Sequence, residues 1–270
     1  MSAGLLVVAG LGDVGMRLAR RWQQGGGEVV GVRRRAGEDE GRLRQVRADL
    51  ASGERLQLLP RRADALVFCA APDQRDEVSY RALYLDGLRR MMDACQAPRL
   101  IFASSTAVYG QDQGEWVDES TPAEAASFNG QVLREAERAL SDHAAGIALR
   151  LSGLYGPGRE AMLRKARTGE PPAARWTNRL HVEDAAAALA HLIDLPAPQS
   201  LYLGSDDAPA LESDVVAWIR AQEGLPALAP ATGPATGRRV ANTRLRATGW
   251  RPEHPDYREG YVPLLRPAAS

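Results

Sequence analysis

The sequence predicts an α/β protein built on a doubly wound parallel sheet. Short apolar runs alternate with amphipathic stretches along most of the chain, beginning with Leu5–Ala9. A glycine turn follows that first run, and a helical stretch then leads to a second apolar run at Glu28–Val32. A strand–helix–strand unit of about 30 residues needs a crossover, so its two strands run parallel. Repetition of this unit indicates a sheet with helices on both faces.

Each further element is predicted in the same way. Apolar runs of strand length and amphipathic stretches of helical length follow one another as far as residue 203. A proline- and glycine-rich stretch at 226–237 predicts a long loop. Strands are expected at 63–70, 99–103, 147–151 and 201–203, and helices from the glycine turn to about Gln24 and at 77–95, 129–143 and 182–195.

The glycine turn itself has the pattern Gly-x-Gly-x-x-Gly. It comprises Gly10, Gly12 and Gly15, with Asp13 and Val14 between the last two. In such a turn the first glycine permits a tight bend, the second lets the backbone approach a pyrophosphate, and the third lets helix and strand pack closely. The helix N-terminus offers free N–H groups to the phosphates. We therefore expect a Rossmann-type dinucleotide site here.

The end of the second strand bears on the choice of dinucleotide. A site for NAD usually has Asp or Glu there to accept from the ribose 2′-hydroxyl, but this chain has Arg33 and Arg34. A guanidinium suits a 2′-phosphate. We expect NADP as the cofactor, with NAD as the alternative.

Composition narrows the classes of function. Lys+Arg and Asp+Glu both total 34, which gives no electrostatic reason to expect a nucleic-acid partner. The N-terminal apolar run is too short for a bilayer and has no basic residues before it, so we expect neither a membrane anchor nor a signal peptide, and a cytoplasmic location. Cys69 and Cys95 lack the spacing of metal ligands, so no metal is expected.

The predicted domains are a dinucleotide-binding Rossmann domain and a small cap. The first comprises residues 1–152 plus about 176–204. After Gly153 glycine and proline cluster, and residues of about 153–175 and 205–270 form the cap, which we expect to be helical and to bind substrate. The segment 175–179 contains Trp176, which could stack on a nucleotide or pack as a loop edge.

Several segments in order resemble the extended short-chain dehydrogenase/reductase family, which includes NAD(P)-dependent epimerases and dehydratases. The similarity extends from the N-terminus to about residue 185 and is closest to short, atypical members. The segments are Gly10–Gly15, Ala48–Leu50, Cys69–Ala71, Ser104–Gly110, Leu149–Leu151, Leu154–Gly158 and Leu180–Asp184.

The resemblance implies roles for particular residues. Asp49, beside Leu50, would meet the adenine, and Ala70 and Ala71 would line the cofactor. Ser105 would orient the substrate. Arg150 and Tyr155 would lie where the family closes its site, and His181 would begin a helix beside the substrate, unless it is a buried, hydrogen-bonded histidine. The resemblance also implies a homodimer through the helices 77–95 and 129–143.

The family's Tyr-x-x-x-Lys pair is missing. Alignment backwards from Glu137 puts Asn129 at the tyrosine position and Leu133 at the lysine position. Asparagine cannot act as a base at neutral pH, and leucine cannot hold a ribose hydroxyl. Tyr84, Tyr109 and His181 are the candidate replacements for proton transfer. Tyr109 is otherwise interpreted as structural or as part of a pocket wall, and Tyr84 occupies the place of an asparagine usual in the family.

Two functions remain open. The first is an NAD(P)-dependent oxidoreductase or nucleoside-diphosphate-sugar epimerase/dehydratase-like enzyme that keeps Ser105 and takes its proton from a different group. Its substrate would be a small molecule, with nucleotide sugars as candidates. The second is a non-catalytic module that senses or scaffolds through bound NADP. The missing pair favours the module and the retained serine favours the enzyme.

Overall fold

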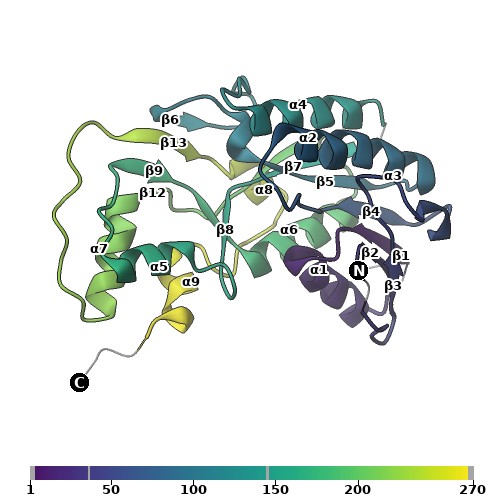
Figure 1. Ribbon diagram of the computed structural model, residues 1–270, viewed down its shortest axis with the longest axis horizontal. Helices are drawn as coiled ribbons and strands as arrows, with labels where there is room; N and C mark the ends of the chain where they lie inside the picture. The colour runs from purple at the N-terminus through teal and green to yellow at the C-terminus, as the bar shows by residue number, and fades with distance from the viewer. Residues whose placement is uncertain (1–3, 36, 144–145, 267–270) are drawn as a thin grey trace. The chain divides into compact units, whose positions relative to one another are not determined.

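The computed structural model describes residues 4–35, 37–143 and 146–266. Seven strands form the central sheet in the order β11-β7-β5-β4-β1-β2-β3, which confirms the predicted α/β fold (Figure 1). Neighbouring pairs from β5 to β3 are parallel. In chain order the strands are β1 (Leu5–Ala9), β2 (Glu28–Arg33), β3 (Leu43–Arg47), β4 (Ala65–Phe68), β5 (Leu100–Ser105), β7 (Gly146–Leu151) and β11 (Leu201–Gly204).

The helices of this sheet lie on both of its faces. Figure 1 shows α2, α3 and α4 on one face and α1 and α6 on the other. Strands buried on both faces need apolar side chains throughout, and Leu6–Ala9 are completely buried. The helices are α1 (Asp13–Gln24), α2 (Glu77–Tyr80), α3 (Leu88–Ala94), α4 (Phe128–Ser141) and α6 (Val182–Asp194), with a π-helical segment at Arg81–Gly87 between α2 and α3.

A second set of elements makes a smaller sheet. Four strands pair in the order β12-β9-β13-β6, and two more form a parallel pair. The strands are β6 (Gln113–Val117), β8 (Gly153–Tyr155), β9 (Arg175–Thr177), β10 (Arg179–His181), β12 (Ala210–Leu211) and β13 (Thr236–Val240). The helices are α5 (Ala161–Thr168), α7 (Glu212–Gln222), α8 (Thr243–Ala247) and α9 (Tyr257–Tyr261). The cap was expected to be helical, but it also contains strands, and most of them have only two or three residues, too few to show alternation.

The chain divides into two compact units. The first unit comprises residues 1–110, 122–150 and 186–202, and the second comprises residues 111–121, 151–185 and 203–270. These bounds differ from the predicted domains mainly in two segments, and by two residues each at 151–152 and 203–204. Residues 111–121 belong to the second unit because β6 pairs with β13, and residues 176–185 belong there because β10 pairs with β8.

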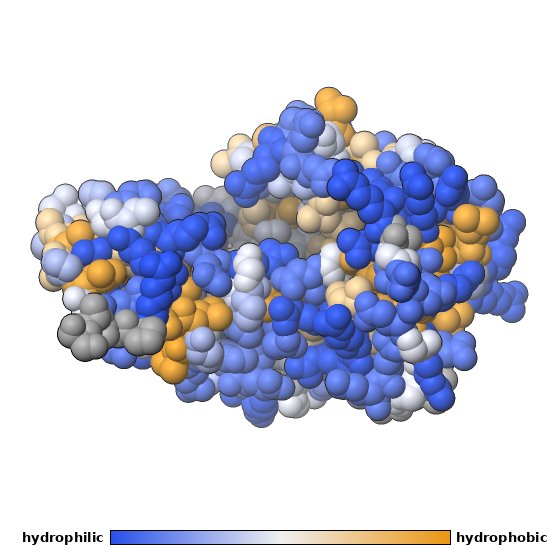
Figure 2. All heavy atoms as spheres, turned by 60° about the horizontal axis from the view of Figure 1, so that its bottom comes forward, coloured by the Kyte–Doolittle hydropathy of each residue, from blue (hydrophilic) through white to orange (hydrophobic). Residues whose placement is uncertain are grey.

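On the face drawn in Figure 2 hydrophilic side chains predominate, and apolar ones lie in separate patches. The large apolar side chains that are most exposed are Leu58, Val78, Trp116 and Val262. Among the described residues, no helix is both long enough and apolar enough to cross a membrane.

Candidate functional site

The glycine turn after β1 is shaped for close approach. Gly10 has φ of +103°, and the N–H groups of Gly10 and Leu11 donate to the carbonyl of Val32 at 3.1 and 2.9 Å. A side chain at Gly10 would overlap the backbone of Ala70, and one at Gly15 would overlap the carbonyl oxygen of Gly10. These two glycines therefore let strand, turn and helix pack together.

Gly12 differs from its two neighbours. A Cβ atom at Gly12 would meet no atom within 4 Å, so this glycine faces open space directly before α1. Open backbone at the positive end of a helix is the arrangement that a pyrophosphate needs. Val14 is buried, while Asp13 forms an ion pair with Arg17 at 2.8 Å in the first turn. The turn thus fits the phosphates of a dinucleotide.

The segments after β2 and β3 carry the residues assigned to the adenosine. Arg33 and Arg34 are both exposed at the end of β2. The Arg34 guanidinium donates to Asp73 Oδ1 at 2.7 Å, whereas Arg33 has no ion pair within the part of the chain that the structure describes. Asp49 is half-buried and accepts from the Ala51 N–H at 2.8 Å, and Leu50 beside it is buried.

The end of β4 lies beside the glycine turn. The backbone of Ala70 is the surface that excludes a side chain at Gly10, and Ala71 is exposed. The Cys69 thiol donates to the Gly10 carbonyl at 3.3 Å, and burial raises the pKa of Cys69 to about 12. This cysteine is therefore a neutral thiol that holds strand and turn together.

Ser105 ends β5. It is half-buried, and its hydroxyl oxygen accepts from the Ala107 N–H at 3.2 Å. By rotation about the C–O bond, the hydroxyl hydrogen can still be donated to another acceptor. A side chain on Gly130 of α4 would overlap the carbonyl of Ala107, so this helix packs directly on the turn that follows the serine.

The positions of the absent tyrosine and lysine lie on α4. Asn129 is half-buried in the first turn, where its side-chain oxygen accepts from Ser127. Leu133 is buried in the core with 4% of its surface exposed. Lys165, the chain's one lysine, is on α5 of the second unit and forms ion pairs with Glu212 and Glu170. No lysine amine is available to a group at residue 129 within the first unit.

Tyr84 lies in the π-helical segment, a distortion frequent at functional sites. Its ring packs edge-on against Phe102 of β5 and against Tyr80, at centroid distances of 6.0 and 5.3 Å. Burial raises the pKa of Tyr84, and the nearby Tyr80 and Cys69 add to the shift. The phenol is therefore protonated at neutral pH and can donate a proton.

Tyr109 and Arg150 lie in the core of the first unit. Only 2% of the surface of each is exposed. Arg150 donates through Nη1 to the Tyr109 hydroxyl at 2.8 Å, and through Nε and Nη2 to Glu137 at 2.9 and 2.7 Å. Ser104 donates to the same carboxylate at 2.7 Å. This network gives both residues structural partners.

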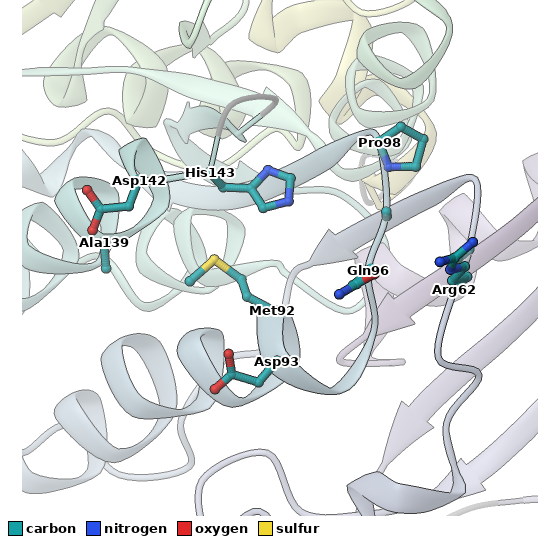
Figure 3. A pocket seen from close by; sticks show the side chains of 10 residues that line it. Arg62, Met92, Asp93, Gln96, Pro98, Ala139, Asp142 and His143 are labelled. Carbon is teal, nitrogen blue, oxygen red and sulfur yellow. The ribbon is translucent and has the colours of Figure 1, made fainter.

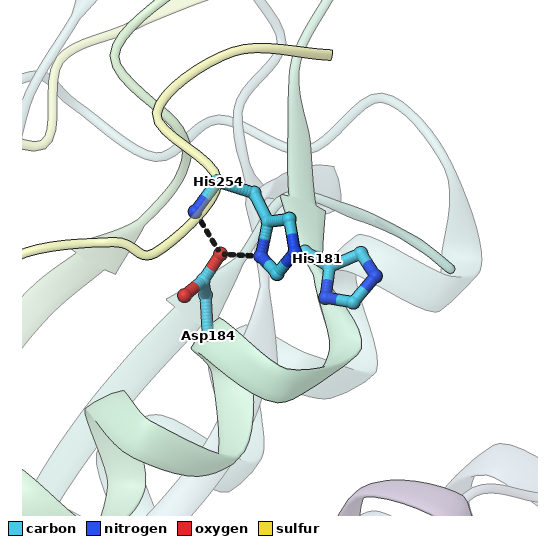
Figure 4. Close-up of side chains that lie close together, drawn as sticks. All are labelled: His181, Asp184 and His254. Carbon is cyan, nitrogen blue, oxygen red and sulfur yellow. Dashed lines mark hydrogen bonds and ion pairs between the residues drawn. The ribbon is translucent and has the colours of Figure 1, made fainter. Parts of the chain in front are cut away.

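His181 belongs to the second unit, where it stacks on His254 (Figure 4). Their ring centroids are 3.8 Å apart. Asp184, completely buried, accepts from Nδ1 and the backbone N–H of His254 at 3.0 and 3.1 Å and from the Glu253 N–H at 2.7 Å. Sequence reasoning missed His254, because it lies 70 residues from Asp184.

These three side chains offer ligand atoms within 4.8 Å of one another, a spacing that raises the question of a metal site. Both oxygens of Asp184 already accept N–H groups, and the two imidazoles lie face to face, tilted by 31°. A metal ion there would compete with those hydrogen bonds. The arrangement is better explained as an Asp–His hydrogen-bonded pair that fixes the imidazole tautomer.

A pocket of about 580 Å³ opens in the first unit (Figure 3). Arg62 and Gln96, which precede β4 and β5, lie on one side of it, and Met92, Asp93 and His143 on the other. It therefore lies at the amino ends of these strands, whereas the glycine turn follows the carboxyl end of β1. Ligands of open α/β sheets bind at the carboxyl ends.

Comparison with known proteins places the chain in a family. The model of the NAD-dependent epimerase/dehydratase family matches residues 5–204. A Methylobacillus flagellatus structure assigned to NAD-dependent epimerases/dehydratases is 37% identical, with a TM-score of 0.86 over 97% of this chain and 98% of that one. Protein YeeZ of Escherichia coli (strain K12) is 34% identical over 73% of this chain and 76% of its own.

A second similar structure contains ligands. MoeE5, solved with UDP-glucuronic acid and NAD, is 26% identical, with a TM-score of 0.77 over 95% of each chain. The family match covers well over half of this chain and includes the glycine turn, Ser105 and His181. The chain belongs to the NAD-dependent epimerase/dehydratase family.

Proposed function

We propose that this protein binds NAD(P) at the glycine turn and is an oxidoreductase or a nucleoside-diphosphate-sugar epimerase/dehydratase-like enzyme. The observation that carries the proposal is the open space beside Gly12 at the start of α1, framed by the close packing of Gly10 and Gly15. A nicotinamide dinucleotide bound there supplies hydride transfer. Asp49, Leu50, Ala70 and Ala71 complete the proposed cofactor site.

The chain's own groups must bind substrate and move the proton. The Ser105 hydroxyl, half-buried at the end of β5, would hydrogen-bond a substrate carbonyl or hydroxyl. Of the three proton-transfer candidates, Tyr84 has the strongest support. It lies in the same unit as the glycine turn and is only half-buried. Tyr109 and His181 are buried and already hydrogen-bonded.

The proposed cofactor preference is NADP over NAD. Arg33 supports it, because its guanidinium is exposed at the end of β2 and forms no ion pair with any described residue. Arg34, the next residue, donates a hydrogen bond to Asp73. Calorimetric titration of the purified chain with NADP(H) and NAD(H) tests both proposals: tighter NADP(H) binding is expected, equal affinities would contradict the preference, and no binding would contradict the function.

Nucleotide sugars are the proposed substrates. The support is the similarity to MoeE5, which binds UDP-glucuronic acid, together with an aromatic platform in the second unit. There the Arg239 guanidinium lies over the rings of Trp116 and Trp176, 5.1 and 4.9 Å from their centroids. Trp116 is 55% exposed and could stack on a base. Isothermal titration with UDP and UDP-glucose tests this point.

The second candidate is a non-catalytic NADP-binding module. It is favoured by the buried Leu133 and by Asn129, which leave the usual proton-transfer positions without an acid or a base. The two candidates separate in single-turnover oxidation of bound NADPH against a panel of carbonyl and nucleotide-sugar substrates. Turnover of any panel member supports the enzyme. Tight NADP(H) binding without turnover supports the module.

A homodimer through α2–α3 and α4 is also proposed. The Arg81 guanidinium joins these helices by two hydrogen bonds of 2.8 Å to Glu135, and Val78 on α2 is 79% exposed. A second copy packed on this helix pair would cover Val78. Light scattering after size exclusion, with Val78→Glu as the disruptive variant, tests the assembly.

A further inference from the structure

Arg34 has a specific partner in the structure. Its Nη2 donates to Asp73 Oδ1 at 2.7 Å, and its Nη1 lies 2.5 Å from Asp73 Oδ2. Two contacts between a guanidinium and both oxygens of one carboxylate form a planar, two-pronged pair. A phosphate would use the same face of the guanidinium, so Asp73 occupies the group that a 2′-phosphate would bind.

The topology places this pair across the glycine turn. β1 lies between β2 and β4, and Ala9 aligns with Val32 on one side and with Phe68 on the other. Arg34 follows β2 and Asp73 follows β4, so their ion pair joins the segments on either side of β1 at its carboxyl end. The glycine turn begins with Gly10 at that same end of β1. The pair therefore borders the site proposed for the dinucleotide.

The ion pair between Arg34 and Asp73 can readily exchange one partner for a ligand. The side chains of Arg34 and Asp73 are 57% and 65% exposed, and an exposed ion pair contributes little to stability. The charge of Asp49 also acts on Arg34, so a second carboxylate attracts the same guanidinium. An incoming phosphate must displace the first and approach the second, whereas a ribose 2′-hydroxyl need displace neither.

We propose that Asp73 competes with the adenosine 2′-phosphate for Arg34, so that this carboxylate sets how strongly the site prefers NADP to NAD. The inference rests on the proposed dinucleotide function. Arg33 attracts the phosphate in both states of the pair, and Arg34 contributes only after Asp73 has released it. Replacing Asp73 then makes the guanidinium of Arg34 available without altering the glycine turn.

The test measures binding, with ligands that lack nicotinamide. Adenosine 2′,5′-bisphosphate and adenosine 5′-monophosphate are titrated calorimetrically into the unmodified chain, Asp73→Asn, Arg34→Ala and the double variant. Asp73→Asn is expected to raise the ratio of affinities for bisphosphate over monophosphate by about threefold to tenfold. In the Arg34→Ala background the same change is expected to leave the ratio where it was.

A matched control comes from α2. Glu77 is 55% exposed and paired with Arg81, so Glu77→Gln removes one charge of similar exposure from another arginine. It should not change the ratio. An unchanged ratio in Asp73→Asn, or an equal change with Arg34 removed, would overturn the inference while leaving dinucleotide binding intact. Failure of NAD(H) and NADP(H) to bind the unmodified chain would overturn both.

Discussion

Arg150 and Glu137 form a buried, two-pronged ion pair that joins the end of β7 to α4. Nε and Nη2 of the arginine meet the two carboxylate oxygens at 2.9 and 2.7 Å, and Ser104 and Arg134 donate to the same oxygens. Burial alone would raise the pKa of Glu137, but the hydrogen bonds and charge of Arg150 outweigh it and lower that pKa. The carboxylate is therefore charged at neutral pH.

Removing one member of this ion pair should greatly lower the free energy of unfolding. Glu137→Gln leaves the Arg150 charge uncompensated in the core, a change that costs about 3–5 kcal/mol in buried pairs. Urea unfolding monitored by circular dichroism measures the loss. Glu135→Gln, on the same helix but in an exposed pair with Arg81, is the control and should cost far less. Equal losses in the two variants would contradict the structural role.

The glycines of the turn should respond differently to substitution. Gly12→Val places its side chain in open space, so the fold should keep its stability while dinucleotide binding is lost, because the pyrophosphate needs that space. Gly10→Ala should instead destabilise the fold, since φ is +103° and the new methyl would overlap Ala70. Thermal melts and calorimetric titration separate the effects. Binding by Gly12→Val at the unmodified affinity would exclude the assigned cradle.

Local sequence signals predicted β1, α1 and β2 well, because each signal lies within the element that it specifies. The glycine spacing, the apolar run and the positions of Arg33 and Arg34 needed no distant partner. By contrast, Arg150 was assigned near the site on the family pattern alone, and its partners Glu137 and Tyr109 lie 13 and 41 residues away. Nothing in the sequence around Arg150 shows that Glu137 and Tyr109 enclose its side chain.

Long-range pairing explains the other differences. β6 pairs with β13, which places residue 113 beside residue 237, so the segment 111–121 could not be assigned to the second unit from its own pattern. Asp73 was also missed as the partner of Arg34. The two are 39 residues apart, and only the strand order β4-β1-β2 shows that their segments flank the same turn.

Asp206 should make stability fall as pH rises. Its side chain is buried, Oδ2 has no hydrogen-bond partner among the described residues, and burial raises its pKa well above the usual value despite the charge of Arg179. A carboxyl whose folded pKa is raised stabilises the fold below its unfolded pKa of about 3.9, and that contribution is lost as pH rises towards the folded value.

Asp206→Asn removes this titration. The stability of the unmodified chain should therefore decline relative to the variant as the pH rises above about 4. Thermal melts of both proteins across that range measure the difference. A difference independent of pH would show that Asp206 titrates alike in the folded and unfolded chains.

Restoring the tyrosine of the family pattern should not restore its chemistry. Asn129→Tyr introduces a phenol, but residue 133 is a buried leucine and cannot lower the pKa of that phenol from about 10. Single-turnover NADPH oxidation is expected to be no faster than in the unmodified chain. A gain in rate would show that another cation takes the place of the lysine.

Tyr84→Phe is the most direct test of where the proton comes from. The phenol lies in a π-helical segment of the unit that carries the glycine turn, and its raised pKa keeps it in the protonated form. Loss of a positioned acid lowers turnover by about 10²–10⁴-fold.

Tyr80→Phe is the control, because Tyr80 packs on Tyr84 at 5.3 Å and its loss perturbs the same aromatic cluster. Single-turnover rates, with cofactor affinity measured in parallel, distinguish proton transfer from misplacement of the dinucleotide. If both variants retain the unmodified rate, Tyr84 is not the acid. If both lose rate and cofactor affinity together, the aromatic cluster positions the cofactor and the proton has another source.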